Sequence, residues 1–163
     1  MKKIFVIFMG LLIIFVGCSK KATSNENIAK EYVEDKGYKI TESKGEIDRY
    51  TLEKSKLYGG LEASQYQQAW GVQTIDPDIY LGKEIIIYGF TVKNHPLQER
   101  DKNAENGVNV YVMLSDEEVI GGYSYPDADV VGGFSSFDGK SLEEVTGLSF
   151  QQWSENWKEK YSN

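Results

Sequence analysis

The chain has 163 residues and a formal net charge of −7, from 18 Lys and Arg against 25 Asp and Glu. This acidic balance argues against nucleic acid as a partner, because binding to phosphates needs clustered Lys and Arg. The single Cys and the single His exclude an internal disulfide and any metal or catalytic site that needs several thiols or imidazoles. The length predicts one globular domain.

The N-terminus has the pattern of a bacterial secretion signal. Lys2 and Lys3 precede an apolar run over residues 4–16, which is too short to cross a bilayer as a helix of about 20 residues. The run ends at Phe15-Val16-Gly17-Cys18, which resembles the lipobox of bacterial lipoproteins. This resemblance implies that residues 1–17 are a signal peptide and that Cys18 becomes the lipid-bearing first residue of the mature chain.

The same resemblance implies a place in the cell and a division of the chain. Residues 18–25 would be the lipidated Cys and a flexible polar tether, and residues 26–163 the globular domain. The lipid on Cys18 would hold the domain on the extracytoplasmic face of the cell membrane. The mature chain as a whole resembles small lipoproteins of Gram-positive bacilli. Because cleavage also removes Lys2 and Lys3, the domain would become more acidic and would not adhere to anionic lipid by itself.

The predicted elements begin with a helix over residues 26–36, because apolar residues recur on one helical face between the capping residue Asn25 and the terminating glycine Gly37. Short strands are predicted over residues 38–40 and 47–52, with a turn at Lys44-Gly45 and a parity slip after Ile47 that indicates a bulge. Another short strand is predicted at residues 70–74. Residues 84–92 are almost continuously apolar, which predicts a strand covered on both faces.

Residues 94–107 are predicted as a charged loop, followed by a hairpin of residues 108–114 and 119–125 around a turn at 115–118. An internal repeat follows: VIGGYSY at 119–125 and VVGGFSS at 130–136 predict two paired strands. Paired glycines in strands mark a bulge or the close approach of another group, either a large side chain or a ligand. The ligand alternative gives a candidate surface formed by Gly121, Gly122, Tyr123, Tyr125, Gly132 and Gly133.

The C-terminal residues predict two short helices. Ser141 with Glu144 and Ser149 with Gln152 both have capping-box spacing, and Gly147 separates the two segments. The second helix carries one aromatic stripe, which we expect to pack against the sheet, with an exposed aromatic platform as the alternative. The stripe consists of Phe150, Trp153, Trp157 and Tyr161.

Together these elements predict an α+β fold. We expect a mostly antiparallel sheet of about six or seven strands, an N-terminal helix, one or two C-terminal helices, and helices on one face of the sheet. A helix followed by a meander of strands resembles the cystatin-like and PepSY-like folds of the bacterial envelope.

Few residues suggest chemistry. His95 follows a strong strand; it is either a catalytic imidazole or the residue that ends the strand before Pro96. Asp127 and Asp129 form a candidate calcium pair, and residues 76 and 78 form a second Asp-x-Asp pair. Both pairs adjoin prolines, and Asp-Pro sequences also form plain turns. No cofactor is indicated.

Three functions are compatible with these residues. The first is a membrane-anchored, non-enzymatic module that binds a protein or a cell-wall component. The second is a small hydrolase that uses acidic residues, and the third is a module that resembles protease inhibitors. The Tyr-rich segments around Tyr58, Tyr66, Tyr123 and Tyr125 favour binding, because tyrosine has an apolar body and a polar tip.

Overall fold

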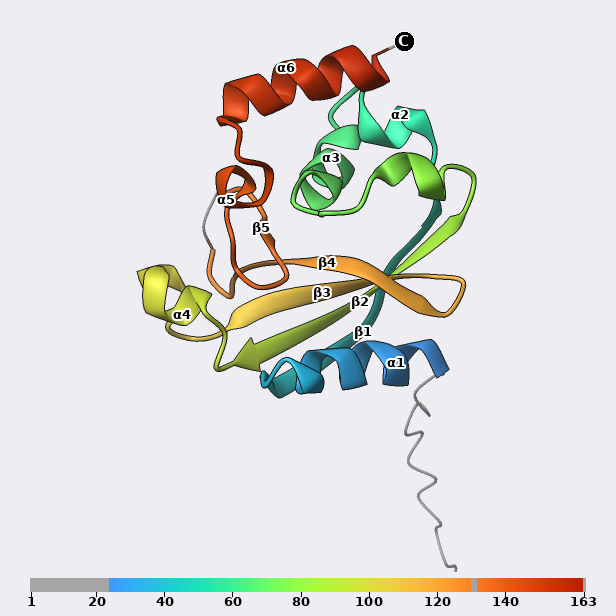
Figure 1. Cartoon of the computed structure of the whole chain (residues 1–163). Coiled ribbons are helices and arrows are strands. Elements are labelled where there is room, and N and C mark those ends of the chain that lie inside the picture. Colours follow the sequence, from blue (N-terminus) through green and yellow to red (C-terminus); the bar gives the residue numbers. More distant parts are fainter. Residues whose placement is uncertain (1–23, 130–131, 163) are drawn as a thin grey trace, which may run out of the picture.

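A five-stranded antiparallel sheet lies between two layers of helices in the computed structural model, which describes residues 24–129 and 132–162. Figure 1 shows α1 on one side of the sheet, and α2, α3 and α6 on the other. The helices are α1 (Ser24–Asp35), α2 (Lys54–Leu57), α3 (Ala63–Gly71), α4 (Leu97–Arg100), α5 (Leu142–Thr146) and α6 (Phe150–Tyr161), with the 3-10 helices η1 (Pro77–Tyr80) and η2 (Lys102–Ala104). The predicted α+β class is therefore confirmed.

The strands form a simple meander in the order β1-β2-β3-β4-β5, and each pairs antiparallel with its neighbour. They are β1 (Lys39–Thr51), β2 (Glu84–Lys93), β3 (Val108–Ser115), β4 (Glu118–Pro126) and β5 (Ser135–Ser136). The prediction of six or seven strands was too high. Whether the helix and meander belong with the cystatin-like or the PepSY-like folds stays a prediction.

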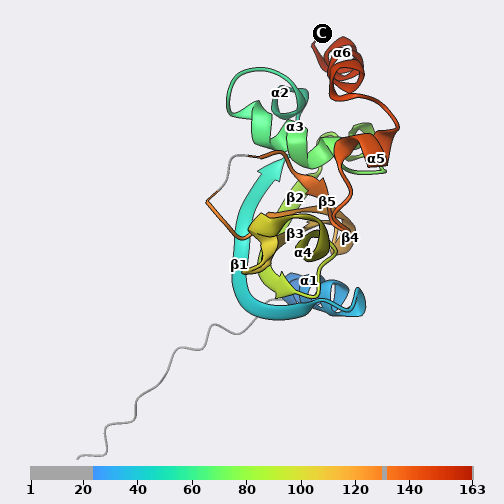
Figure 2. The same ribbon diagram turned by 90° about the vertical axis from the view of Figure 1, so that its left-hand side faces the viewer.

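Two predicted strands are one continuous strand, β1. It pairs with β2 along its length, and three register shifts replace the expected turn at Lys44-Gly45. One shift lies between Glu46 and Asp48, where the parity slip at Ile47 predicted a bulge. Bulges bend a strand and increase its twist. Figure 2 shows β1 curving from the α1 side of the sheet toward α2.

The predicted strand at residues 70–74 is instead the end of α3 and the turn after it. Trp70 lies fully inside, and its indole N–H donates a hydrogen bond to the hydroxyl of Tyr50 at 3.0 Å. The predicted loop at residues 94–107 also differs, because it contains α4 and η2 and buries Leu97 and Ala104. In both segments, the tertiary contacts of the buried side chains outweigh the local sequence pattern, which predicted a strand in the first segment and a loop in the second.

Strands β2 and β3 are covered on both faces, as the apolar run of residues 84–92 predicts. Alternate side chains enter two different cores, so Ile86 and Phe90 lie on the α1 side while Ile85 and Ile87 lie on the α3 side. Helices therefore pack on both faces, and the expectation of helices on one face was wrong. Helices on one face alone would leave the other apolar face of these strands exposed to solvent.

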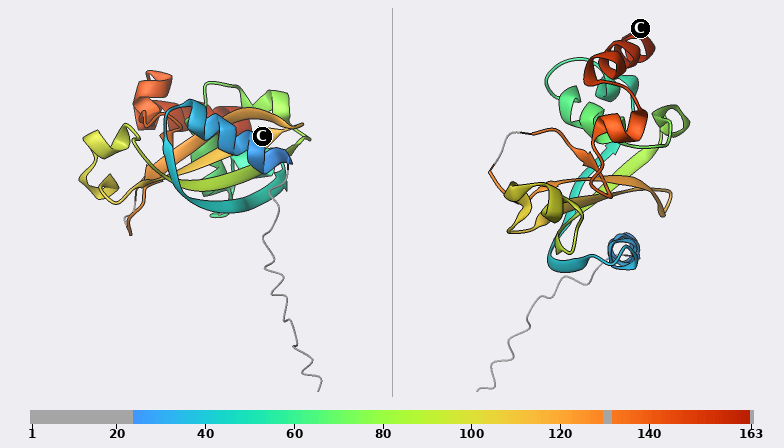
Figure 3. Two further views of the ribbon diagram at one scale, coloured as in Figure 1. Left: turned by 90° about the horizontal axis from the view of Figure 1, so that it is seen from below. Right: turned by 60° about the vertical axis from the view of Figure 1, so that its left-hand side comes forward.

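The two C-terminal helices form with the predicted capping boxes. In each, the serine hydroxyl accepts from the backbone N–H of the third helical residue, and that residue's side chain accepts from the serine N–H. Helix α6 lies over α2 and α3 rather than on the sheet (Figure 3, right). No helix among the described residues has both the length and the apolar composition needed to cross a bilayer.

Candidate binding cleft

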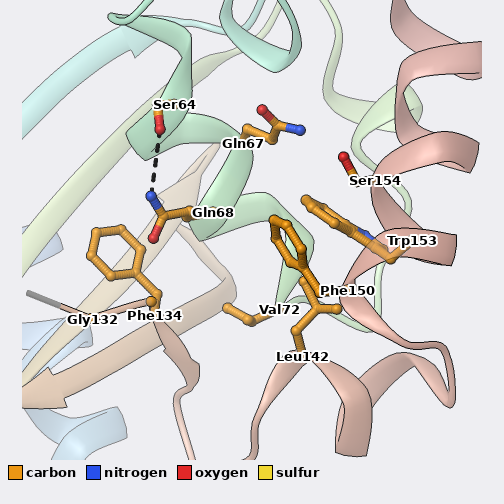
Figure 4. Close-up of a pocket in the computed structure, with 11 residues that line it drawn as sticks. Ser64, Gln67, Gln68, Val72, Gly132, Phe134, Leu142, Phe150, Trp153 and Ser154 are labelled. Atoms are coloured by element: carbon orange, nitrogen blue, oxygen red, sulfur yellow. Dashed lines mark hydrogen bonds between the residues drawn. The ribbon is translucent and has the colours of Figure 1, made fainter.

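A cleft of about 430 Å³ opens between α3, the start of α6 and the segment of residues 132–134 (Figure 4). Its volume falls within the range of about 300–1,000 Å³ that is common for small-ligand sites. Three segments that are far apart in the sequence meet here: residues 64–72, 132–134 and 142–154. Each wall is fixed by a different local feature of the chain.

The first wall is one face of α3. Ser64, Gln67, Gln68 and Val72 recur at helical spacing and face the cleft together. The Gln68 amide donates to the Ser64 hydroxyl at a long 3.5 Å. Within the described part of the chain, the Gln67 amide has no hydrogen-bond partner. This wall therefore carries amide and hydroxyl groups with unused hydrogen-bonding capacity.

The second wall is positioned by the two capping boxes. Leu142 and Phe150 each occupy the first helical position after a capping serine, Ser141 for α5 and Ser149 for α6. Capping fixes where a helix begins and satisfies its free N–H groups. The two apolar side chains are therefore held at the mouth of the cleft. Phe150 is 66% exposed, although it is a large hydrophobic side chain at the start of the aromatic stripe.

Trp153 lies at the bottom of the second wall and is almost fully buried. Its indole lies directly on Gly71 of α3, where a β-carbon would come within 2.5 Å of the ring. Glycine at this position therefore allows α6 to approach α3 closely. The rings of Phe150 and Trp153 are 5.9 Å apart, so exposed and buried aromatic surface is continuous at the cleft.

The third wall is the segment of residues 132–134. A β-carbon at Gly132 would meet no atom within 4 Å, and one at Gly133 would meet only the Gln68 amide oxygen at 4.0 Å. The backbone is therefore bare toward the cleft. Phe134 ends this wall and stacks on Tyr123 at 4.5 Å and on Tyr125 at 5.5 Å between ring centroids.

The side chains that line the cleft are uncharged, although the whole chain has a net charge of −7. They comprise aromatic rings, aliphatic groups, primary amides and hydroxyls. Such a lining can bind a neutral ligand that combines an apolar surface with hydrogen-bonding groups. It contains no acid–base pair and no nucleophile activated by a base.

The six residues of the predicted ligand surface are not brought together. Gly132 and Gly133 line the cleft, whereas Gly121 and Gly122 are covered from another side by Gln73 and Phe137. The Gln73 amide exchanges two hydrogen bonds of 3.0 Å with the backbone of Gly122, as a neighbouring strand would. The first glycine pair thus meets side chains of the chain itself, and the second pair is open.

Tyr123 and Tyr125 belong to a group of stacked rings that includes the cleft residue Phe134. Tyr123 is 8% exposed and lies between the rings of Tyr111 and Phe134. Tyr125 is half-buried, and its hydroxyl is 2.6 Å from that of Tyr111. Burial is the main cause that raises the pKa of Tyr111 and of Tyr123 above the ordinary value. These rings stack on Phe134 and are not among the residues that line the cleft.

His95 is buried, and the backbone occupies both nitrogens of its ring. Leu97 N–H donates to Nδ1 at 3.1 Å, so the proton lies on Nε2, which is 2.9 Å from the carbonyl oxygen of Phe137. Burial lowers the pKa of His95 below the ordinary value. The imidazole therefore links the turn after β2 to the turn after β5 through hydrogen bonds. Because both ring nitrogens are occupied, neither is free to act on a substrate.

The two Asp-x-Asp pairs have different surroundings. Asp127 accepts a hydrogen bond from the Asn109 amide at 3.0 Å, while Asp129 is exposed. Asp76 caps η1, and together with Asp78 it contacts the Lys160 ammonium of α6, which lowers the pKa of Asp76. Among the described residues no three His, Cys, Asp or Glu side chains are grouped to hold a metal ion. Calcium at Asp127 and Asp129 stays a prediction.

Several cleft residues have no counterpart in the sequence prediction, chiefly Gln67, Gln68 and Ser154. The periodic spacing of residues 64, 67, 68 and 72 was the available signal, but Gly59-Gly60 and the apparent strand at 70–74 obscured it. Cys18 and the tether before Ser24 lie outside the described residues. Helix α1 includes Ser24 and Asn25, which the sequence placed in the tether.

Comparisons with protein-family models, with curated proteins and with solved structures find no match to this chain.

Proposed function

We propose that this chain is a membrane-anchored extracytoplasmic lipoprotein whose domain binds a component of the cell envelope through the cleft between α3 and α6. The observation that carries the proposal is the cleft itself, an uncharged and partly aromatic surface on an acidic chain. Phe150 supports it most directly, because this aromatic side chain is 66% exposed and, with Leu142, Val72 and Phe134, gives the cleft a partly apolar lining.

The position of the first helix supports the anchoring part of the proposal. Helix α1 begins at Ser24 and lies on the face of the sheet opposite to α2, α3 and α6 (Figures 1 and 3). Cys18 precedes this helix by only a few residues. A lipid on Cys18 would therefore hold the α1 side toward the membrane and present the cleft on the far side, toward the rest of the envelope.

The two alternative functions find less support. A hydrolase that uses acidic residues needs two carboxylates facing one another, and the lining of the cleft has none. A protease-inhibitor-like module was inferred from a helix followed by a meander, and this order of elements is present. Order of elements does not define a binding site, so the cleft remains the better guide to function.

Anchoring is tested by expressing the full chain and its Cys18→Ala variant in a bacterial host that is fed labelled palmitate. We expect the wild-type chain to incorporate the label, to lose residues 1–17 and to fractionate with membranes. The variant should stay unlabelled and unprocessed. Equal processing and fractionation of both proteins would contradict the lipid anchor.

Binding is tested with Phe150→Ala and with Ile79→Ala as the matched control, because Ile79 is also exposed, at 57%, and does not line the cleft. The full chain and both variants, kept in detergent, are mixed with cell-wall fragments that have been freed of membrane lipid, and the mixtures are sedimented. We expect Phe150→Ala to reduce the bound fraction strongly, whereas Ile79→Ala behaves as wild type. Equal sedimentation of all three proteins would contradict binding through this cleft.

A further inference from the structure

We propose that the occupant of the cleft is an uncharged glycan chain of β-linked pyranose rings. The inference rests on the proposed function, since it names the chemical class of the envelope component that this same cleft would bind. Three properties of the cleft carry it: the exposed aromatic face at its mouth, the unused amides and hydroxyls on its walls, and the lack of charge in its lining.

The aromatic face fits the ring of a sugar. Pyranose rings whose substituents are equatorial present axial C–H groups on both faces, and such flat apolar faces stack on aromatic rings. Phe150 offers an exposed ring of this kind, and the neighbouring Leu142 is only partly buried. The capping box at Ser149 fixes the start of α6, so stacking on Phe150 requires no ordering of backbone.

The polar groups of the cleft fit the edge of a sugar. Gln67 and Ser154 face one another across the cleft from α3 and α6 (Figure 4), and neither has a hydrogen-bond partner among the described residues. Gln68 makes only the long bond to Ser64. Amides and hydroxyls can each donate and accept, which matches ring hydroxyls and acetamido groups that also do both.

Charge separates a glycan from the other polymers of an envelope. A cationic ligand would be drawn to this acidic chain but would find no carboxylate in the cleft, and an anionic ligand would find no Lys or Arg there. Burying an unpaired charge is costly, so either ligand would be disfavoured at this site. A neutral polymer meets no such penalty.

The shape of the site agrees with a chain-like ligand. Gly132 and Gly133 add no side chains to the third wall, so part of the cleft is bounded by bare backbone, with Phe134 as the only side chain of this wall. A polymer can therefore lie along the groove with its rings against Phe150 and its hydroxyls against α3. The helices that line the cleft, α3 and α6, lie on the side of the sheet away from α1 (Figure 1), where an envelope polymer outside the membrane would be accessible.

The test is a titration of the full chain, purified in a detergent without a sugar headgroup, with three tetrasaccharides. Chitotetraose is neutral and β-linked, its fully de-N-acetylated form is cationic at pH 6, and maltotetraose is neutral but α-linked. Binding is followed by calorimetry and by tryptophan emission, because Trp153 lines the cleft. We expect chitotetraose to bind most tightly, with the other two weaker by at least about tenfold.

The variants assign binding to the cleft. Phe150→Ala should weaken binding of chitotetraose at least about tenfold, Gln67→Ala by a smaller factor, and Ile79→Ala should leave it within about twofold. Tightest binding of the cationic tetramer, or equal binding by wild type and Phe150→Ala, would overturn the inference. If no glycan binds while envelope fragments still bind in a Phe150-dependent way, the glycan inference fails and the proposed function stands.

Discussion

The two faces of the sheet are packed by different side chains. On the α1 side the core is mainly aliphatic, with Val33, Val92, Val108 and Val110 fully buried, and most of its residues come from α1 and from alternate positions of β2 and β3. On the α3 side half of the buried core residues are aromatic, and they include all three tryptophans of the chain. Both faces bury β2 and β3 equally well.

The difference shows where this chain can carry a binding site. Aliphatic side chains, which have no polar atoms to satisfy, fill most of the core on the α1 side. Large rings with N–H and O–H groups need hydrogen-bond partners; the indole N–H of Trp157 donates to the carbonyl oxygen of Leu57 at 2.7 Å. Trp153 and Trp157 also line hollows at the edge of this core. The cleft lies at such a margin, where α6 rests on α3 instead of on the sheet.

The largest expected effect is on the aromatic side. Trp157→Ala removes a buried ring that lies between Trp153 and Tyr161, and it leaves the carbonyl oxygen of Leu57 without its donor. We expect a loss of about 3–5 kcal/mol in the free energy of unfolding. Urea unfolding followed by circular dichroism measures it, with Phe150→Ala expected within about 0.5 kcal/mol of wild type. A loss below about 1 kcal/mol would mean that α6 is not part of the packed structure.

The next effect tests the contact of α6 with α3. Gly71→Ala would normally strengthen a helix, by up to about 1 kcal/mol. Here the new methyl group meets the Trp153 ring, so we expect a destabilisation of about 1–3 kcal/mol and an altered tryptophan emission. Gly60→Ala is the control, because its β-carbon would meet no atom within 4 Å. A stabilising Gly71→Ala would contradict the close approach of the two helices.

The smallest effect lies at the margin of the α1 side, at His95. Its pKa is lowered in the folded chain, so the unfolded chain binds a proton more readily as the pH falls. Neutral His95 therefore contributes its full share to the free energy of unfolding at pH values above the unfolded-state pKa of about 6.5. As the pH falls below that value, this contribution decreases by at most about 1.4 kcal/mol per pH unit. Urea unfolding at several pH values between 7 and 5 should show this slope in wild type.

The control for that slope is His95→Gln, which removes the imidazole. We expect the variant to be less stable at pH 7, because the Leu97 N–H and the Phe137 carbonyl lose a buried partner, and to lack the His95 part of the pH dependence. Identical slopes in both proteins would show that protonation of His95 is not linked to unfolding.

Parts of this fold could be predicted because the signal was local. The apolar run at residues 84–92 requires cover on both faces, and the capping boxes at Ser141 and Ser149 set the starts of α5 and α6 from three-residue spacings. The segment around Trp70 could not be predicted. Its alternating apolar residues imitate a strand, and only the tertiary partners of Trp70 show why it is helical.

The cleft was predicted only in part for a related reason. The aromatic stripe and the second glycine pair were recognised, but nothing local places Gly133 near Gln68 or Trp153 near Gly71. The stripe was also expected on the sheet, whereas it packs on α2 and α3 and leaves Phe150 exposed. A site built from three distant segments becomes visible only when the chain is folded.

The most direct test of the central claim is hydrogen exchange, measured by mass spectrometry on the full chain with and without cell-wall fragments. Binding through the cleft predicts slower exchange in α3, at residues 132–134 and at the start of α6, with α1 and the outer strand β1 unchanged. Slower exchange confined to α1 or β1, or no change anywhere, would contradict the account.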